Sequence, residues 1–177
     1  MTPSADRAPS HLLAFLEKHS VDFEFLSPGV PMPTVLAAAA ALGVAPELIL
    51  KTLLFTGQDG SYVIAIANGT RRVDPRLLSA VCGLERPRPA KTEVILDVTG
   101  YPAGGVAPLG LPAGLPVVVD VKVMAQPVAY GGGGQDDLLL RLRPAEIVRL
   151  NSAAMARIVD DDGPEPGTLV EAAAAPR

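Results

Sequence analysis

Lys51 is a candidate catalytic residue because it is the single charge in an apolar run, residues 48–55, that reads Leu-Ile-Leu-Lys-Thr-Leu-Leu-Phe. A charge in such a segment costs free energy unless it has a partner or faces a cleft. A lysine there can hold a phosphate or carbonyl oxygen, or act as a base if its pKa is lowered. A second interpretation stays open, in which the stem of Lys51 covers the edge of a strand while its ammonium reaches water.

A glycine-rich loop is the second candidate. Residues 99–110 read Thr-Gly-Tyr-Pro-Ala-Gly-Gly-Val-Ala-Pro-Leu-Gly, with four glycines, two prolines and no charge. Neither a helix nor a central strand tolerates this composition, and a solvated linker would be more polar. Such a loop lets bare backbone amides approach a ligand that side chains would keep away. Alternatively, Gly104 and Gly105 form only a turn.

A run of four glycines, residues 131–134, is the third feature. By itself such a run is typical of a flexible connector. Strands predicted on both sides of it change that interpretation, because a loop between two strands can line a cleft. Asp136 and Asp137 follow the run, and they either orient a water molecule or solvate the turn.

Taken in order, these three motifs resemble the YbaK/ProX family of aminoacyl-tRNA deacylases. That family shares its fold with the editing domain inserted in bacterial prolyl-tRNA synthetases. The similarity runs from about Phe15 to Ile158, nearly the whole chain. It implies a hydrolase that cleaves the ester bond of a mischarged aminoacyl-tRNA.

The resemblance also implies roles for individual residues. Lys51 matches the family's functional lysine, which makes it the catalytic candidate. The stretch from Gly104 to Pro108 matches the family's Gly-x-x-x-Pro loop, whose backbone recognises the aminoacyl group and the terminal adenosine sugar. Because ester hydrolysis builds charge on the carbonyl oxygen, fixed amide donors there would stabilise the transition state. The substrate-binding residues predicted in this way are Thr52, Gly104, Gly105, Val106, Pro108, Gly133 and Gly134.

The chain departs from the family in the loop after the first predicted strand. Several members carry a histidine and a tyrosine there, whereas residues 25–31 of this chain are Phe-Leu-Ser-Pro-Gly-Val-Pro. His11 and His19 fall on the first predicted helix, so we expect no histidine base. The sequence has no metal-ligand spacing, Ser-His-Asp set or nucleotide-binding glycine motif, and we expect neither metal nor cofactor. Two mechanisms then remain for the reaction: hydrolysis by a positioned water, or attack by the substrate's own nucleophilic group.

Composition favours one globular domain. The chain has 177 residues, of which 49% are hydrophobic, enough for a sizeable core. We expect a single domain over residues 9–159, a disordered N-terminus over 1–8 and a disordered acidic tail over 160–177. The single cysteine, Cys82, excludes an intramolecular disulfide and is interpreted as a small buried residue. With no membrane-length apolar run and no signal-peptide pattern, we expect a cytoplasmic protein with no membrane contact.

The charge distribution bears on an RNA partner. The net charge of −4 is unfavourable for binding phosphates, which usually requires a basic surface. Residues 71–91 nevertheless hold six cations and two acids, a local balance of +4. This cluster is either a solvated face or an RNA contact, and the residues alone leave both open.

Periodicity and end signals predict mixed secondary structure. Predicted helices cover residues 10–16, 35–42, 75–81, 91–98, 144–150 and 152–159, with a short helical turn from Pro46. Predicted strands cover residues 21–25, 50–55, 62–67, 117–119, 128–130 and 138–142. The fold class that follows is α/β, of the α+β type, with helices around a mixed sheet. The resemblance implies that this sheet is twisted and partly closed.

The leading hypothesis is a trans-editing deacylase for a tRNA mischarged with a small amino acid such as Ala, Ser or Cys. Its partners would be the 3′ end of aminoacyl-tRNA and a tRNA synthetase, with the oligomeric state open between monomer and homodimer. Among candidate pocket-wall residues that set the amino acid are Leu26, Met32 and Ile66. The alternative is a catalytically weak or inactive binding module for an aminoacyl-like ligand or a protein partner.

Overall fold

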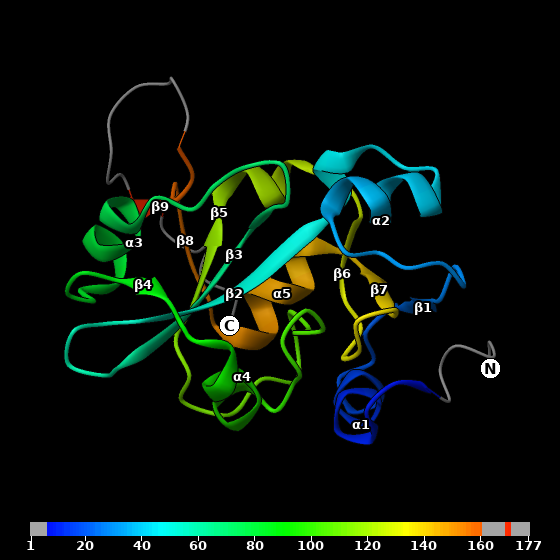
Figure 1. Cartoon of the computed structure of the whole chain (residues 1–177), viewed down its shortest axis with the longest axis horizontal. Coiled ribbons are helices and arrows are strands. Elements are labelled where there is room, and N and C mark those ends of the chain that lie inside the picture. Colours follow the sequence, from blue (N-terminus) through cyan, green and yellow to red (C-terminus); the bar gives the residue numbers. More distant parts are fainter. Residues whose placement is uncertain (1–6, 161–168, 171–177) are drawn as a thin grey trace, which may run out of the picture.

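The computed structural model describes residues 7–160 and 169–170, and it arranges the strands in two sheets (Figure 1). The larger sheet is ordered β4 (Arg88–Pro89), β2 (Leu50–Thr56), β3 (Tyr62–Asn68), β5 (Val117–Asp120), β8 (Ala154–Ala156) and β9 (Leu169–Val170). The smaller sheet is ordered β1 (Glu24–Leu26), β7 (Leu139–Leu142) and β6 (Ala129–Gly132). The helices are α1 (Ser10–Lys18), α2 (Val35–Leu42), η2 (Pro46–Leu48), α3 (Pro75–Cys82), α4 (Thr92–Thr99), η3 (Val121–Ala125) and α5 (Pro144–Asn151).

The larger sheet is mixed, as predicted. β2 and β3 form an antiparallel hairpin, whereas β5 runs parallel to both β3 and β8. The sequence analysis expected one partly closed sheet, and the structure has two that meet at a bridge between Ile49 and Tyr130. In Figure 1, β2 runs across the middle of the molecule from the α2 end to the β4 end. The α/β class is therefore confirmed, with closure limited to this junction.

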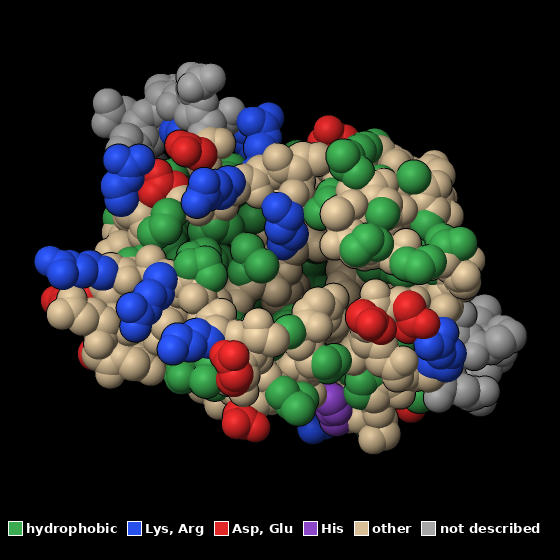
Figure 2. Space-filling model, viewed as in Figure 1, with side chains coloured by type: hydrophobic (Ala, Val, Ile, Leu, Met, Phe, Trp, Pro, Cys, Tyr) green, Lys and Arg blue, Asp and Glu red, His purple; other side chains and the backbone are tan. Residues whose placement is uncertain are grey.

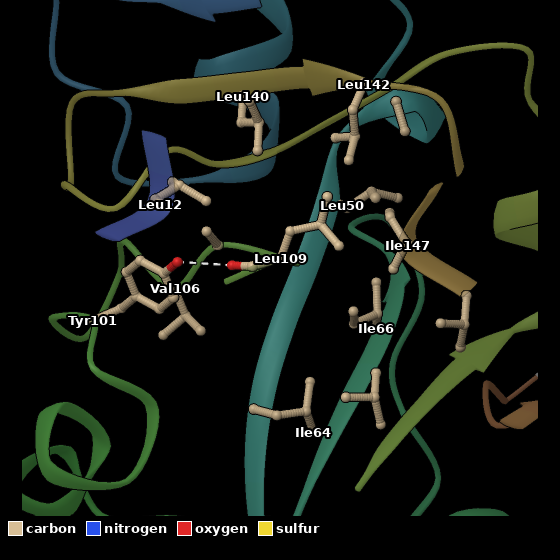
Figure 3. Close-up of a cluster of buried hydrophobic side chains, with 14 of the residues drawn as sticks. Leu12, Leu50, Ile64, Ile66, Tyr101, Val106, Leu109, Leu140, Leu142 and Ile147 are labelled. Carbon is tan, nitrogen blue, oxygen red and sulfur yellow. Dashed lines mark hydrogen bonds between the residues drawn. The ribbon is translucent and has the colours of Figure 1, made fainter. Parts of the chain in front are cut away.

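Alternating side chains of the hairpin supply two hydrophobic clusters. Leu50 and Leu54 of β2 and Ile64 and Ile66 of β3 share one face, which packs with α1, α5 and the loop 99–110 (Figure 3). The opposite face belongs to a second cluster that includes residues of α3, β5 and β8. β3 is buried on both faces because it lies between two strands and two layers.

Local capping signals place several helices as the sequence predicts. The Thr34 hydroxyl accepts a hydrogen bond from the amide of Ala37 at 3.1 Å, and Gly43 ends α2 with a φ of +66°. At α3, the carboxylate of Asp74 accepts the amide of Arg76 at 2.7 Å, ahead of a proline in the first turn. Both signals act within one helical turn, so they need no distant partner.

The helix predicted over residues 152–159 is wrong. Ser152 ends α5 in the left-handed region with a φ of +48°, and Ala154–Ala156 then form β8 beside β5. The Asp120 carboxylate accepts the amides of Ile158 at 2.8 Å and Val159 at 3.2 Å, which fixes the chain after β8. Pairing with a strand about 35 residues earlier in sequence overrides the helix propensity of the alanines.

The chain ends lie mostly outside the described residues. Disorder was predicted for residues 1–8 and 160–177, and of these the structure describes only Arg7, Ala8, Asp160 and 169–170. Leu169–Val170 form β9, which pairs antiparallel with β8, so these two residues differ from the prediction. Within the described residues, no helix is both long and apolar enough to cross a membrane.

Candidate active site

A cavity of about 640 Å³ opens beside β2, between α2, α4 and the loop that contains Gly104. Figure 2 shows the molecule hollowed on this face, with hydrophobic side chains around the hollow. Most of the lining is aliphatic, and the lining side chains that can hydrogen-bond are Thr34, Lys51 and Thr52. The cavity therefore suits a ligand with an apolar part and a polar or anionic part.

The cavity follows the part of β2 whose outer edge has no strand beside it. β4 pairs with β2 only at Phe55 and Thr56, and β6 lies near β2 but its only pairing there is with Ile49, the residue before β2, through Tyr130. The carbonyl of Leu54 accepts the amide of Ala90 at 2.8 Å, so the backbone of Leu54 points away from β3. Because backbone direction alternates along a strand, the N–H and C=O of Thr52 point the same way. These polar groups face the cavity.

Lys51 stands at this free edge. Its side chain is partly buried, and Nζ donates to the carbonyl of Arg71 at 3.5 Å. Among the described residues it forms no ion pair with a carboxylate. An ammonium has three donors, so Lys51 retains hydrogen-bonding capacity for an anionic or carbonyl oxygen in the cavity.

Thr52 carries a buried hydroxyl that no described group satisfies. Its Oγ1 is inaccessible to solvent and has no hydrogen-bond partner, and the Oδ1 of Asn68 is in the same state. Thr52 and Asn68 lie on the same face of the hairpin, since Leu50 is the register partner of Asn68. A buried polar atom without a partner costs roughly 1–3 kcal/mol of stability.

The loop 99–110 is anchored from the core side by Tyr101. Its ring is fully buried, and its hydroxyl donates to the carbonyl of Leu109 at 2.7 Å (Figure 3). Burial raises the pKa of the Tyr101 phenol above its ordinary value, so the group remains a donor at neutral pH. Gly110 has a φ of +67°, and a Cβ there would lie 2.6 Å from the Tyr101 hydroxyl. Tyr101 thus fixes the path of the loop without touching the cavity.

Within that loop, Gly104 and Val106 line the cavity, whereas Gly105 does not. The amide of Gly105 donates to the carbonyl of Pro102 at 3.0 Å, so it is not a free donor in this structure. A Cβ on Gly105 would lie 2.8 Å from the backbone of Gln135. The positive φ in the pair is that of Gly104, at +85°. Gly105 therefore permits close packing, and Gly104 supplies the turn.

The glycine run 131–134 packs against the same loop. Gly132 lines the cavity, and a Cβ there would lie 2.5 Å from the carbonyl oxygen of Val106. Gly133 donates to Leu138 at 2.8 Å, and Gly134 donates to the carbonyl of Gly105 at 2.9 Å. These contacts bring two backbone segments close enough to form one wall.

The predicted site residues consequently fall in two layers. Lys51, Thr52, Gly104 and Val106 line the cavity, while Gly105, Pro108, Gly133 and Gly134 lie behind the lining. Pro108 is buried, and its carbonyl accepts the Asn151 side-chain amide at 2.8 Å.

Several lining residues were not predicted. They are Pro33, Thr34, Val35, Leu36, Ala38, Ile49, Leu50, Leu53, Leu54, Gly69, Pro89, Ala90, Ile95, Gly132 and Leu139. Of the pocket-wall candidates only Met32 lines the cavity, since Ile66 is in the core and Leu26 packs beside α2. One signal was available in α2, whose sequence Val-Leu-Ala-Ala-Ala-Ala-Ala-Leu is apolar on every side although Leu36 is 67% exposed. An apolar residue that remains exposed on such a helix indicates a cleft or a contact surface.

Histidines and metal ligands contribute nothing to this cavity. His11 lies on α1 and His19 directly follows its last residue, and their rings contact Tyr101 and Phe15 at centroid distances of 4.8 Å and 4.5 Å, respectively. Over residues 7–160 and 169–170, no group of three or more His, Cys, Asp or Glu side chains is arranged to hold a metal ion. The chemistry argued for this site therefore uses Lys51, hydroxyl and backbone groups.

The fold defines a class of small α/β proteins that known structures share. The crystal structure of a hypothetical protein, APE2540, is 30% identical, has a TM-score of 0.79, and matches 85% of this chain and 100% of that one. A structure described as "a putative trans-editing enzyme for prolyl tRNA synthetase" is 27% identical, with a TM-score of 0.75, and matches 91% of this chain and 99% of that one.

Residues 30–150 match the family model of the aminoacyl-tRNA editing domain, and the chain belongs to this family. It is thereby an enzyme of the class that hydrolyses mischarged aminoacyl-tRNA. The proline–tRNA ligase of Pelobacter propionicus is 31% identical over 107 residues, which are 60% of this chain and 19% of the ligase. The chain thus spans about a fifth of that ligase.

Proposed function

We propose that the chain acts in trans on a tRNA mischarged with a small amino acid and hydrolyses the ester between that amino acid and the terminal ribose. The observation that carries the proposal is the free edge of β2, where the Lys51 ammonium and the Thr52 backbone face one apolar cavity. The match to nearly the whole of a structure described as a trans-editing enzyme supports action in trans.

The cavity volume fits the end of a charged tRNA better than a free amino acid. Ligand pockets of about 300–1,000 Å³ enclose most of a drug-sized molecule. At about 640 Å³, this cavity has room for an aminoacyl group together with the adenosine that carries it. Met32, Val35 and Leu139 offer no charged partner, so the amino acid side chain bound there is uncharged and small.

The reaction adds water across the ester. The water oxygen attacks the carbonyl carbon, the bond to the ribose oxygen breaks, and a proton from water passes to that oxygen. The products are a free amino acid and an intact tRNA. Lys51 would stabilise the charge that develops on the carbonyl oxygen, or hold the terminal phosphate. The backbone N–H and C=O of Thr52 would bond to and orient the substrate.

One observation favours a binding module as the second candidate. Neither His11 nor His19 reaches the cavity, and the amide of Gly105 is already bonded to Pro102, so activating groups are few. Such a module would bind an aminoacyl-adenosine without releasing the amino acid.

A panel of tRNAs charged with Ala, Ser, Cys and Pro, incubated with the purified protein, tests the proposal. We expect release of at least one of the small amino acids and intact tRNA as the other product. Binding of a non-hydrolysable aminoacyl-adenosine analogue, with no release from any charged tRNA, would establish the binding module instead. If no amino acid is released and the analogue does not bind, both candidate functions are rejected.

A further inference from the structure

The two sides of the cavity mouth carry opposite charge. On one side are the cations of α3, β4 and their flanking turns, here called the basic surface: Arg71, Arg72, Arg76, Arg86, Arg88 and Lys91. On the other, an adjoining hollow lined by residues 29–33 and Gly104 also contains Asp136 and Asp137, of which Asp137 forms an ion pair with Arg7 at 2.6 Å. Figure 2 shows lysines and arginines gathered over the α3 and β4 end of this face.

The basic surface is continuous with the cavity. Pro89 and Ala90 line the cavity, and Arg88 and Lys91, both exposed, flank them in sequence. On the far side of β2, Lys51 reaches the carbonyl of Arg71 at 3.5 Å, which joins the cavity to the turn before α3. An anionic chain that leaves the cavity across β4 therefore meets positive charge at once.

Lys91 is placed where stability does not favour it. It is the residue that precedes the first turn of α4, and its side chain makes no capping hydrogen bond. A cation at a helix N-terminus opposes the helix dipole at a cost of about 0.3–1 kcal/mol. Helix stability therefore does not account for Lys91, whereas an anionic partner does.

The rim of the mouth is apolar. Leu36 and Leu53 line the cavity with 67% and 36% of their surface exposed, and Leu96 of α4, next to the lining residue Ile95, is 55% exposed. Val30, in the adjoining hollow, is 49% exposed. Exposed apolar side chains beside cations suit a single nucleic-acid strand, whose bases pack on apolar surface while its phosphates contact the cations.

We infer that the single-stranded 3′ end of the RNA leaves the cavity across β4 and α4, with its phosphates on Arg88 and Lys91 and the RNA helix beyond them over α3. This inference rests on the proposed function. Asp136, exposed at the opposite side, repels a phosphate chain from that exit. Although the chain as a whole carries −4, this surface concentrates positive charge and so offers a favourable path for a polyanion. Two acids touch the basic surface near α3: Asp74 forms an ion pair with Arg76 at 2.9 Å, and the amide of Asp160 donates to the carbonyl of Arg72 at 3.0 Å. Arg88 and Lys91 are therefore the better probes.

The test compares Arg88→Glu/Lys91→Glu with a matched charge change away from the cavity, Lys18→Glu/Arg143→Glu. Lys18 and Arg143 are exposed and do not line the cavity. Binding of an RNA hairpin that ends in CCA and carries no amino acid is measured by fluorescence anisotropy at several salt concentrations. Hydrolysis is measured on a mischarged tRNA and on the matching aminoacyl-adenosine ester, which lacks the phosphates.

We expect the Arg88/Lys91 variant to bind the hairpin at least tenfold more weakly, with a salt slope shallower by about 1.4, or 0.7 for each lost contact to a single strand. Its kcat/KM for the tRNA should fall in parallel, while that for the small ester stays within twofold of the unaltered protein. The Lys18/Arg143 variant should retain the hairpin affinity and the kcat/KM for the tRNA. Asp136→Lys should bind the hairpin no more weakly than the unaltered protein.

Three results overturn the inference. The first is equal hairpin binding by both charge-reversal variants, and the second is weaker hairpin binding after Asp136→Lys. The third is an Arg88/Lys91 variant that binds RNA as the unaltered protein does but has lost affinity for a prolyl-tRNA synthetase, which would make the basic surface a protein contact. Failure of the proposed function gives a different result. In that case no ester is hydrolysed by the unaltered protein, while the hairpin measurements still decide where RNA binds.

Discussion

The carbonyl of Gly105 accepts a hydrogen bond from the amide of Gly134 at 2.9 Å, although 28 residues separate them in the sequence. This bond ties the glycine-rich loop that bears Gly104 to the segment between β6 and β7. Neither position has room for a side chain: a Cβ on Gly105 would lie 2.8 Å from the backbone of Gln135, and a Cβ on Gly134 would lie 2.4 Å from the Pro9 ring. The wall of the cavity thus depends on two backbones in contact, and the first prediction tests it.

Gly105→Ala should destabilise the fold by about 1–3 kcal/mol, because its methyl group would overlap the backbone of Gln135, which cannot move like a flexible side chain. Urea unfolding measures the change. Gly114→Ala is the comparison: with a φ of +83° and open space around it, it shows the cost of backbone strain without steric overlap, whereas Gly105→Ala adds overlap without a positive φ. A Gly105→Ala protein as stable as the unaltered one, with full activity, would show that the two segments separate readily.

Lys51→Ala should remove about 2–4 kcal/mol of transition-state stabilisation and lower kcat/KM for a mischarged tRNA accordingly. The melting temperature should stay nearly unchanged. The reason is that, within the part of the chain that the structure describes, the ammonium makes one long hydrogen bond, at 3.5 Å, and the residue lines the cavity. Lys18→Ala, an exposed lysine on α1, is the control. Equal turnover in the two variants would exclude a catalytic role for Lys51.

Tyr101→Phe should cost about 1–3 kcal/mol of stability, because the buried carbonyl of Leu109 loses its donor at 2.7 Å.

The Tyr101→Phe variant also tests how stability depends on pH. Burial raises the pKa of Tyr101, so its stabilising contribution is fully present below about pH 10, the ordinary value, and declines as the pH rises beyond it. Urea unfolding at pH 8 and pH 10.5 should show a smaller loss for Tyr101→Phe than for the unaltered protein. An equal loss in both would contradict this assignment.

Asp120→Ala should cost about 3 kcal/mol or more, because the carboxylate accepts the amides of Lys122, Ile158 and Val159 at 2.8–3.2 Å and all of them would lose their partner. Asp120→Asn, which keeps one acceptor oxygen, should cost less. Asp97→Ala, an exposed acid on α4, serves as the control. Thermal unfolding of the three variants orders them, and a cost for Asp120→Ala no larger than for Asp97→Ala would argue against the anchoring role.

Deacylation should survive the double substitution His11→Ala/His19→Ala and excess EDTA, within a few-fold of the untreated protein. His11, on α1, and His19, directly after it, both lie outside the cavity lining, and the described residues hold no cluster of metal ligands. Amino acid release from the best substrate of the tRNA panel is the measurement. A collapse of activity under either treatment, with the circular dichroism spectrum retained, would mean that a histidine or a metal ion takes part.

Local signals in the sequence determined most of the elements. Thr34 and Asp74 cap α2 and α3 through hydrogen bonds to residues two or three positions ahead, and the hairpin of β2 and β3 closes over a short turn. The single charge at Lys51 could be recognised for the same reason, since the cost of a charge depends on its immediate apolar neighbours. Each of these interactions is complete within a few residues.

Only the tertiary structure decided what lies against what. Residues 154–156 are a strand because β5 is beside them, and the amide of Gly105 turns inward because Pro102 accepts it and Gln135 leaves no space. Ile66 was a pocket-wall candidate and is in the core, whereas Leu36 and Leu139 line the cavity from distant parts of the chain. Apolar residues bury equally well in a core or around a cavity, so their pattern in sequence does not distinguish the two. The difference is set by long-range packing, which brings together groups that no local pattern relates.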